Sequence, residues 1–415
     1  MIIKRRWKHT VCFVLILSLW MLVIYRFLRW SEQEDSRLLH QGVPDKHAYL
    51  RKPSEMSTAE HFGQFERSEK IEDIINWSDQ YLMTKGPFQF LENFRNPCFF
   101  SDVGRLSCLP YFFIIGEPKC GTTDLYVSLR QHPEISWEHK KEVNYFSNRR
   151  FETGSNYWTF ERYLDEFLRS TAAISTTISR IPCRDSWKDC DYHPLITGDG
   201  TVRMLGDKQY EFFRNNITQK EPNLTNADIL FHLNPNTKLI IILRNPIERA
   251  YSDYHFNSWV RRLFNASLEH FHTTMVEQIS RFTKCCQATS IRSCAYQHGE
   301  VPFKERFLRL GVYYIFIKDW LRVFPRHQIL ILRFEDWAKN KRQTYNEILK
   351  FLDIRQLTIA EENLLVSRPN LNQRPSYLQM IGDMYPKTRE LLRGFYAPHN
   401  EELARLLSDS RFLWI

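Results

Sequence analysis

Short apolar runs alternate with amphipathic stretches along the chain from about residue 111 onward. Runs of this kind bounded by turn residues are typical of strands buried on both faces, and three occur, at 111–115, 238–243 and 328–333. Helical patterns follow the first two, at Thr122–Gln131 and from Pro246, and a helical stretch with Trp320 precedes the third. This alternation predicts an α/β fold with a central, mostly parallel sheet flanked by helices.

The pattern is weaker outside these segments. Residues 29–103 are charged, interrupted by prolines and without sustained periodicity, so we interpret them as a stem with a short helix near Ile71–Met83. Residues 104–415 then form the folded domain. Within it, Ser170–Pro194 has no clear period and is predicted to be an irregular insertion.

An uncharged apolar run, Val11–Tyr25, follows a basic cluster at the amino terminus. With its flanking aromatic residues, the run is long enough for a transmembrane helix in a thin membrane. We interpret 1–9 as a cytosolic tail and 10–28 as a signal anchor, because a basic cluster stays cytosolic and the rest of the chain then faces the lumen. A cleaved signal peptide is the alternative, although no small-x-small cleavage site follows the run.

Cysteines and glycosylation sequons agree with a lumenal location. Most cysteines outside the apolar run form close groups, which predicts small disulfide loops: 98/108, 183/190 and 285/286/294. Cys183 and Cys190 would pin the irregular insertion. A zinc site fits less well, since no Cys-x-x-Cys pair or His cluster accompanies the cysteines. The candidate glycosylation sites are Asn76, Asn216, Asn223 and Asn265.

Composition and charge narrow the class of protein only partly. The chain is 43% hydrophobic and 14% aromatic, which supports a sizeable core and excludes a disordered protein. Its formal net charge of +9 favours an anionic partner: a nucleotide, an acidic lipid, nucleic acid or a sulfated polysaccharide. Charge alone does not choose among these partners.

The loop after the first strand, Gly116–Thr123, has the composition of an anion-binding site. A glycine-containing turn between strand and helix can direct backbone N–H groups at a phosphate, and the helix N-terminus adds favourable partial charge. Lys119 adds a full charge, and two threonines add hydroxyl donors. The loop is not the P-loop of kinases, because Thr122 stands where that motif has lysine. A plain connection capped by the threonines is the alternative.

A second candidate element follows the strand at 238–243. Arg244 comes directly after this strand, where a guanidinium can bind a phosphate bidentately, and Ser252 lies on the helix that starts near Pro246. For Arg244 alone, a surface arginine on an ordinary amphipathic helix is the favoured alternative. Two elements in this order, both after strands, support each other.

Together these elements resemble the Golgi carbohydrate sulfotransferases, whose sulfuryl donor is 3′-phosphoadenosine 5′-phosphosulfate (PAPS). Residues 118–123 are similar to the family's Pro-Lys-x-Gly-Thr-Thr loop, and Arg244 with Ser252 is similar to its 3′-phosphate element. The resemblance covers about residues 108–415 and implies a P-loop-like sulfotransferase fold. It implies that the lysine reaches the oxygen between phosphorus and sulfur. The implied 5′-phosphosulfate contacts are Lys119, Cys120, Gly121, Thr122 and Thr123.

The same resemblance indicates a catalytic carboxylate. An acceptor hydroxyl must lose its proton as it attacks sulfur, so a positioned base is needed. Relatives carry Glu-x-x-Phe-Phe shortly after the loop lysine, and here Glu142 follows Lys119 by about the same distance, with Tyr145 and Phe146 behind it. The resemblance therefore implies that Glu142 is the general base. By itself, the Lys-Lys-Glu stretch would be an ordinary solvated charge run.

Other family features match less well. Tyr313 lies in a stretch similar to a segment whose tyrosine contacts the 3′-phosphate side, with an aromatic core helix as the alternative. Heparan-type relatives carry Glu-Lys-Thr-Pro where this chain has 197–201, without a lysine. The relatives' Lys-Gly-Arg loop has only a partial substitute, at 372–375.

The expected reaction is in-line transfer of a sulfuryl group from PAPS to a glycosaminoglycan hydroxyl, without a metal ion. The loop string 114–126 and the terminal Phe412–Trp414 resemble the branch that adds 6-sulfate to the N-acetylgalactosamine (GalNAc) 4-sulfate of chondroitin or dermatan sulfate. The alternatives are sulfation of heparan sulfate or a uronyl position, a P-loop kinase, and a non-catalytic, membrane-tethered binder of sulfated glycans.

The expected partners are a glycosaminoglycan acceptor and the Golgi membrane, but not nucleic acid, and a homodimer is compatible with the sequence. Basic residues would hold the polyanionic acceptor, although each also fits an ordinary solvated face: Lys140, Lys141, Arg203, Arg261 and Arg262.

Overall fold

The computed structural model describes residues 78–152, 157–182, 189–206, 221–256, 267–296, 306–368 and 382–415. All of them belong to one compact unit, Phe65–Ile415. The predicted cytosolic tail, the membrane anchor and most of the stem lie outside the described residues. None of the described helices is long and apolar enough to cross a membrane.

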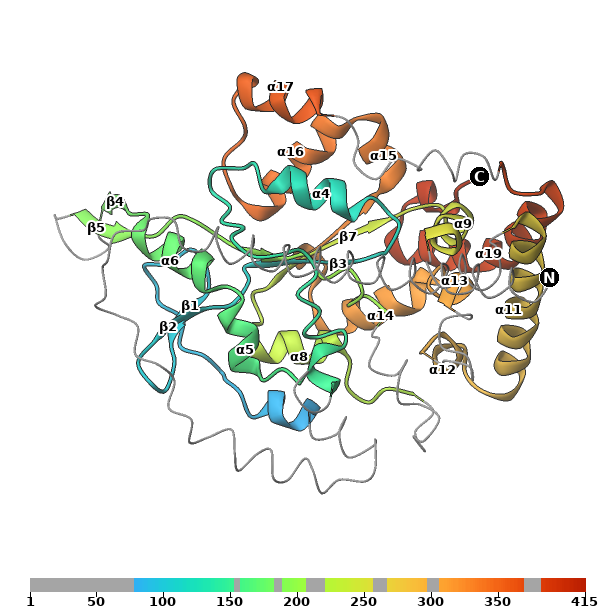
Figure 1. Cartoon of the computed structure of the whole chain (residues 1–415), viewed down its shortest axis with the longest axis horizontal. Helices are drawn as coiled ribbons and strands as arrows, with labels where there is room; N and C mark the ends of the chain where they lie inside the picture. Colours follow the sequence, from blue (N-terminus) through green and yellow to red (C-terminus); the bar gives the residue numbers. More distant parts are fainter. Residues whose placement is uncertain are drawn as a thin grey trace, which may run out of the picture. The chain divides into compact units, whose positions relative to one another are not determined.

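A four-stranded sheet forms the centre of this unit (Figure 1). Every neighbouring pair in it is parallel, and the strand order is β6 (Gly198–Asp199), β3 (Phe112–Gly116), β7 (Lys238–Leu243) and β8 (Ile329–Arg333). The three apolar runs in the sequence are thus three adjacent strands, and the predicted parallel α/β architecture is confirmed. The edge strand β6 was not predicted, because two residues are too few to show a period.

The other elements surround this sheet. The helices are α4 (Thr122–Leu129), α5 (Phe160–Asp165), α6 (Leu168–Thr176), α8 (Asn226–Leu233), α9 (Pro246–Phe256), α11 (Leu268–Ala288), α12 (Ile291–Tyr296), α13 (Arg306–Arg309), α14 (Tyr313–Val323), α15 (Phe334–Lys339), α16 (Lys341–Leu352), α17 (Ile359–Ser367) and α19 (Pro386–Leu407). The short strands outside the sheet are β1 (Cys98–Phe100), β2 (Leu106–Cys108), β4 (Ser179–Pro182) and β5 (Asp189–Tyr192). Residues 78–83, at the end of the predicted stem helix, are helical.

Both faces of the sheet are covered, which explains why its strands read as continuous apolar runs. Ile240 and Ile242 of β7 pack into one core cluster with residues of α4 and α16. Leu239 and Ile241, which point the other way, pack into a second cluster with residues of α8 and α14. Figure 1 shows α4 and α16 above the sheet and α8 and α14 below it.

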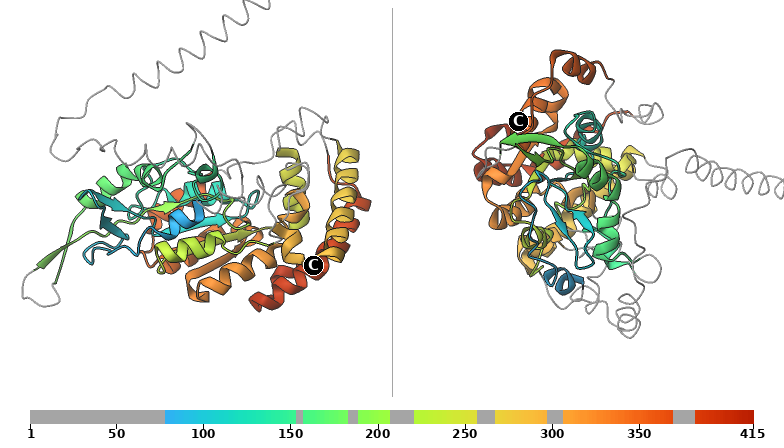
Figure 2. Two further views of the ribbon diagram at one scale, coloured as in Figure 1. Left: turned by 90° about the horizontal axis from the view of Figure 1, so that it is seen from below. Right: turned by 90° about the vertical axis from the view of Figure 1, so that its left-hand side faces the viewer.

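The predicted irregular insertion at 170–194 is wrong. This segment contains most of α6 and an antiparallel hairpin of β4 and β5, which projects from the body of the unit (Figure 2). All residues of β4 are exposed, so the hairpin has no buried face and no apolar alternation to reveal it in the sequence. Cys190 is disulfide-bonded, whereas Cys183 lies outside the described residues.

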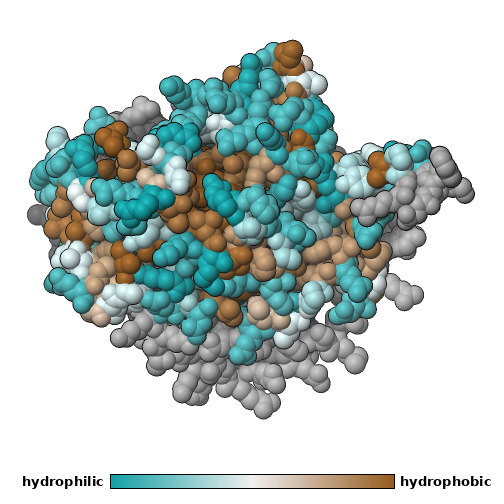
Figure 3. All heavy atoms as spheres, turned by 180° about the vertical axis from the view of Figure 1, so that it is seen from behind, coloured by the Kyte–Doolittle hydropathy of each residue, from teal (hydrophilic) through white to brown (hydrophobic). Residues whose placement is uncertain are grey.

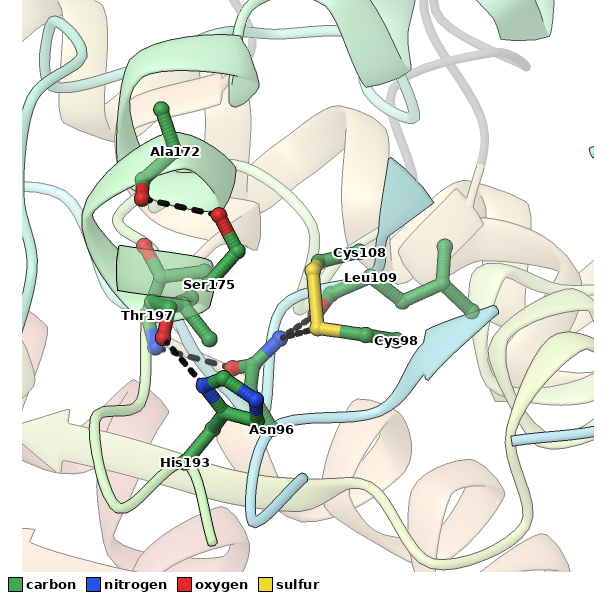
Figure 4. The surroundings of a disulfide bond; sticks show 9 residues. Asn96, Cys98, Cys108, Leu109, Ala172, Ser175, His193 and Thr197 are labelled. Atoms are coloured by element: carbon green, nitrogen blue, oxygen red, sulfur yellow. Dashed lines mark hydrogen bonds between the residues drawn. A yellow bond between two sulfur atoms is a disulfide. The ribbon is translucent and has the colours of Figure 1, made fainter. Parts of the chain in front are cut away.

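The predicted local disulfides are confirmed where the cysteines are described. Cys98 bonds to Cys108 and Cys285 to Cys294, while Cys286 is a free thiol. Beside the first bond, the Asn96 side chain links two segments (Figure 4): its Nδ2 donates to the Leu109 carbonyl at 2.9 Å, and its Oδ1 accepts from the Thr197 amide at 2.9 Å. The disulfide hairpin is thereby tied to the segment that enters β6.

On the face of the molecule shown in Figure 3, apolar side chains lie among the hydrophilic ones. α17 carries exposed apolar residues, namely Ile359, Leu364 and Val366. Asn223 is exposed, as a glycosylated asparagine must be. The other three sequons lie outside the described residues.

Candidate active site

The predicted phosphate loop connects the carboxyl end of β3 to the first turn of α4. Gly121 is the N-cap of α4 and has a φ of 86°, and no side chain caps the helix. A Cβ at Gly121 would lie 2.6 Å from Cδ2 of Phe334, so glycine is required both by the left-handed backbone and by the close approach of this ring. An uncapped helix N-terminus at the end of a parallel strand is a suitable place for a phosphate.

The loop's side chains divide between the core and the surface. Cys120 is completely buried, and burial raises the pKa of its thiol to about 12, so this thiol is inert as a nucleophile at neutral pH. Neither Thr122 nor Thr123 makes a side-chain hydrogen bond to another described residue, so both hydroxyls are available to a ligand. The available hydroxyls and helix amides fit a bound phosphate.

Lys119 carries the loop's positive charge. Its φ is 70°, and its Nζ lies 3.6 Å from the centre of the Phe256 ring, at the end of α9. Burial lowers the pKa of Lys119, and the nearby carboxylate of Asp253 acts in the opposite direction. The aromatic face restricts where the ammonium group can lie while leaving its charge intact.

Arg244 meets this loop from the neighbouring strand. Its Nη1 lies 3.4 Å from the Lys119 carbonyl oxygen, and its guanidinium lies 5.0 Å from the centre of the Phe334 ring. Tyr313 is buried, and its hydroxyl donates to the main-chain carbonyl of Arg244 at 2.8 Å. The two predicted nucleotide elements therefore converge, and Tyr313 supports the backbone of the second one.

Ser252 lies on the helix that joins these two regions. α9 begins just after Arg244 and ends at Phe256, whose ring faces Lys119. Ser252 is partly buried in the middle of this helix, and its hydroxyl makes no hydrogen bond to a described residue. Its hydroxyl is thus available to a ligand.

Glu142 lies on the other side of the phosphate loop, beside β6. Its Oε1 accepts a hydrogen bond from Lys141 Nζ at 2.5 Å, and its side chain remains 37% exposed, so a substrate can reach it. Two residues on, the Asn144 amide donates to Thr201, which comes just after β6. Since β6 and β7 flank β3 in the sheet, Glu142 and Arg244 belong to opposite sides of the loop.

A small pocket opens beside the loop. It is lined by Glu117, Pro118, Arg203, Gly206, Asp253, Arg306 and Leu310. Arg306 forms an ion pair with Asp253 at 2.8 Å, whereas Arg203 has no hydrogen-bond or ion-pair partner among the described residues. An arginine without a protein partner, next to the residue that precedes Lys119, is a candidate contact for an anionic substrate.

Sequence reasoning missed two aromatic residues at this site. Phe334 follows β8 directly and touches both Gly121 and Arg244, and Phe256 packs under Lys119. The available signal was the position of Phe334 after a predicted strand, since the carboxyl ends of parallel strands meet at one edge. No local pattern marked Phe256.

Asp199, at the end of β6, is a buried carboxylate near Glu142. Burial raises the pKa of this carboxyl from 3.8 to about 6, while hydrogen bonds from Thr201 and Tyr163 and the charge of Lys141 act in the opposite direction. The folded protein therefore binds a proton in a pH range where the unfolded chain does not.

We therefore expect Asp199 to add stability as the pH falls. Its carboxyl binds a proton more tightly in the folded state, so as the pH falls from about 7 to about 3 this group adds ~3 kcal/mol to the free energy of unfolding. Asp199→Asn lacks this contribution. In urea unfolding across this range, the free energy of unfolding of wild type should increase relative to that of Asp199→Asn as the pH decreases. An equal dependence of the two free energies on pH would contradict the prediction.

Comparison with known families agrees with this arrangement. A family model for the sulfotransferase domain matches residues 109–369, which include the phosphate loop, Glu142, Arg244 and Tyr313. The chain belongs to the sulfotransferase domain family.

Individual relatives point to carbohydrate sulfotransferases. The chain is 35% identical over 321 residues to carbohydrate sulfotransferase 15 of Homo sapiens, a match that covers 75% of this chain and 55% of the human protein. The chain thus spans little more than half the length of that relative. It is also 25% identical to the membrane-associated sulfotransferase kil1 of Dictyostelium discoideum, with 75% of this chain and 68% of that protein covered.

Among solved structures, a sulfotransferase from Alicyclobacillus acidocaldarius is similar at 22% sequence identity and a TM-score of 0.46. The superposition covers 72% of this chain and 96% of the bacterial one.

Proposed function

We propose that this chain transfers a sulfuryl group from PAPS to a hydroxyl of a glycosaminoglycan, with Glu142 as general base. The observation that carries the proposal is the order of groups along the sheet edge: Glu142 beside β6, the Lys119 loop after β3, and Arg244 after β7. Ligands of open parallel sheets bind at the carboxyl ends of the strands. This order suits an acceptor on one side of the sulfuryl group and the 3′-phosphate on the other.

Each group has a distinct part in the proposed reaction. The acceptor oxygen forms a bond to sulfur while Glu142 takes the hydroxyl proton. The bond between sulfur and the bridging oxygen breaks, and its electron pair stays on the leaving phosphate. The ammonium of Lys119 and the amides at the start of α4 stabilise the charge that develops there. Arg244 and Ser252 hold the 3′-phosphate and thereby fix the position of the donor in the site.

We further propose that the acceptor is chondroitin or dermatan sulfate, at the 6-hydroxyl of GalNAc 4-sulfate, and that the enzyme acts in the Golgi lumen from a signal anchor at 10–28. The resemblance of the loop string 114–126 supports this acceptor, as does 35% identity to carbohydrate sulfotransferase 15. The pocket lined by Arg203 beside Pro118 suits an acceptor that carries a sulfate next to the reacting hydroxyl.

Transfer of labelled sulfate tests the function directly. The chain is incubated with labelled PAPS and, separately, with chondroitin 4-sulfate, dermatan sulfate and heparan sulfate, followed by disaccharide analysis. We expect label in a disaccharide whose GalNAc carries both 4- and 6-sulfate. Label confined to heparan sulfate or to uronic acid would contradict the proposed acceptor. Binding of chondroitin 4-sulfate without any transfer would contradict the proposal that the chain is an enzyme. Transfer from labelled ATP would favour a kinase.

Arg203 is expected to affect the KM for the acceptor more than the KM for the donor. Arg203→Gln removes one charge-assisted contact, so the KM for chondroitin 4-sulfate should rise about tenfold. The KM for desulfated chondroitin and for PAPS should change little. Arg169→Gln, at an exposed arginine of α6 outside the pocket, is the matched control. Equal effects on sulfated and desulfated acceptors would count against a sulfate contact.

A further inference from the structure

The backbone around Glu142 is held in an uncommon conformation. Glu142 and Asn144 have φ values of 64° and 60°, in the left-handed region that residues other than glycine rarely adopt. Such a conformation persists only when surrounding groups hold it in place. Several bonds are local: Asn144 Nδ2 donates to the Glu142 carbonyl oxygen at 2.7 Å, and the amides of Asn148 and Arg149 donate to the Asn144 carbonyl oxygen. A further bond comes from a distant segment of the chain.

That distant bond starts at the Asn144 amide. The N–H of Asn144 donates to the Thr201 hydroxyl at 3.1 Å, and this hydroxyl donates to Asp199 Oδ1 at 2.6 Å. The other oxygen of Asp199 accepts from the hydroxyl of Tyr163, on α5, at 3.1 Å. Asp199 and Thr201 are both completely buried, so water does not compete for these bonds.

The chemistry of these groups gives the chain of bonds a direction. An ionised carboxylate can only accept, so Asp199 requires the Thr201 hydroxyl proton to point toward it. The lone pairs of the same hydroxyl then face the Asn144 amide. Asp199 itself belongs to β6, which pairs with β3, so the loop that carries Glu142 is anchored to the same sheet as the phosphate loop.

Gly200 allows this anchor to lie close to α4. A Cβ at Gly200 would be 2.6 Å from Cδ2 of Tyr126 and 3.5 Å from Cγ of Lys141, whose Nζ contacts Glu142. A side chain at position 200 would therefore clash with Tyr126, and either this ring or the segment would have to move, whereas the contact with Lys141 would be an ordinary one.

We propose that Asp199 and Thr201 are positioning residues for Glu142: they fix its loop against β6 so that the carboxylate faces the sulfuryl donor. The inference rests on the proposed function, because it assigns a role relative to the general base. Neither residue touches the donor or the acceptor in this proposal.

Paired substitutions at Thr201 test the proposal. Thr201→Val keeps the shape of the side chain but removes the hydroxyl, whereas Thr201→Ser keeps the hydroxyl. Thr197→Val is the matched control, because Thr197 is equally buried on the same segment, but its hydroxyl donates to the Ser136 carbonyl at 2.6 Å and has no bond to the Glu142 loop.

Two readouts are needed: steady-state transfer from PAPS, and hydrogen exchange of the peptide spanning 142–148 followed by mass spectrometry. Thr201→Val should lower kcat roughly 10- to 100-fold with unchanged KM for PAPS, because the base is displaced while donor binding is intact. It should also speed exchange at the Asn144 amide. Thr201→Ser should restore both values, Thr197→Val should change neither, and Asp199→Asn combined with Thr201→Val should be no worse than the worse single variant.

The outcomes separate this inference from the proposed function. Wild type that transfers no sulfate to any acceptor overturns the function, and with it the role assigned here. If wild type is active and Thr201→Val keeps wild-type kcat, the positioning role is overturned while the function stands. A loss of kcat without faster exchange of 142–148, or an equal loss in Thr197→Val, also overturns it.

Discussion

Glu142→Gln is expected to lower kcat for sulfuryl transfer about 10²- to 10⁴-fold while leaving donor binding intact. The amide has almost the same shape as the carboxylate but cannot take the acceptor's proton. Because Glu142 lies beside β6, and the phosphate loop and Arg244 follow β3 and β7, the change should leave the donor site undisturbed. Steady-state rates and the affinity for 3′,5′-bisphosphoadenosine, measured by calorimetry, check both parts.

A matched control is available a few residues further on. Glu152 is also partly buried and paired with a basic residue, since its Oε2 lies 3.0 Å from Arg149 Nη1. Glu152→Gln should transfer sulfate at close to the wild-type rate. Near wild-type turnover in Glu142→Gln would refute its role as the base. Equal losses in both variants would indicate a general effect on the loop.

Arg244→Ala is expected to weaken binding of 3′,5′-bisphosphoadenosine by about 3 kcal/mol, roughly 100-fold, because two charge-assisted hydrogen bonds to the 3′-phosphate are lost. The Arg244 guanidinium packs against Phe334, and Tyr313 holds its main-chain carbonyl, so the side chain is already oriented in the absence of ligand. Retention on immobilised 3′,5′-bisphosphoadenosine and calorimetry measure the effect.

Arg333 provides the control for this substitution. It ends the next strand, in register with Leu243 of β7, but it pairs with Asp336 at 3.4 Å and makes no hydrogen bond or ion pair with the loop at 116–123 among the described residues. Arg333→Ala should retain nucleotide affinity within a few-fold of wild type. Unchanged affinity in Arg244→Ala, or equal weakening in both variants, would remove the assignment of the 3′-phosphate to Arg244.

The proposed donor side of the site was the part most accessible to prediction from the sequence. Lys119 and Thr122 lie in one short stretch between an apolar run and a helical pattern, and Arg244 directly follows another apolar run. Because parallel strands end at the same edge of a sheet, their positions in the sequence already place them near each other. The contact between Arg244 and the Lys119 carbonyl agrees with this expectation.

The proposed acceptor side was less accessible, because its organisation depends on contacts between distant segments. Thr201 contacts Asn144 across 57 residues, and Tyr163 contacts Asp199 across 36. No periodicity marks such pairs, and the two-residue strand β6 that brings them together is too short to be recognised. The β4–β5 hairpin was wrongly predicted to be irregular for a related reason, since an exposed hairpin has no apolar face that would produce a pattern in the sequence.

The sequence by itself predicted the layered α/β architecture, the loop proposed to bind phosphate and the arginine that follows β7, since these depend on hydrophobic period and on the residues at strand ends. Tertiary structure alone decided that β6 borders β3, that Phe334 and Phe256 shape the surroundings of Arg244 and Lys119, and that Asp199 and Thr201 hold the Glu142 loop. The physical reason is that burial and hydrogen-bond geometry belong to groups that only folding brings together.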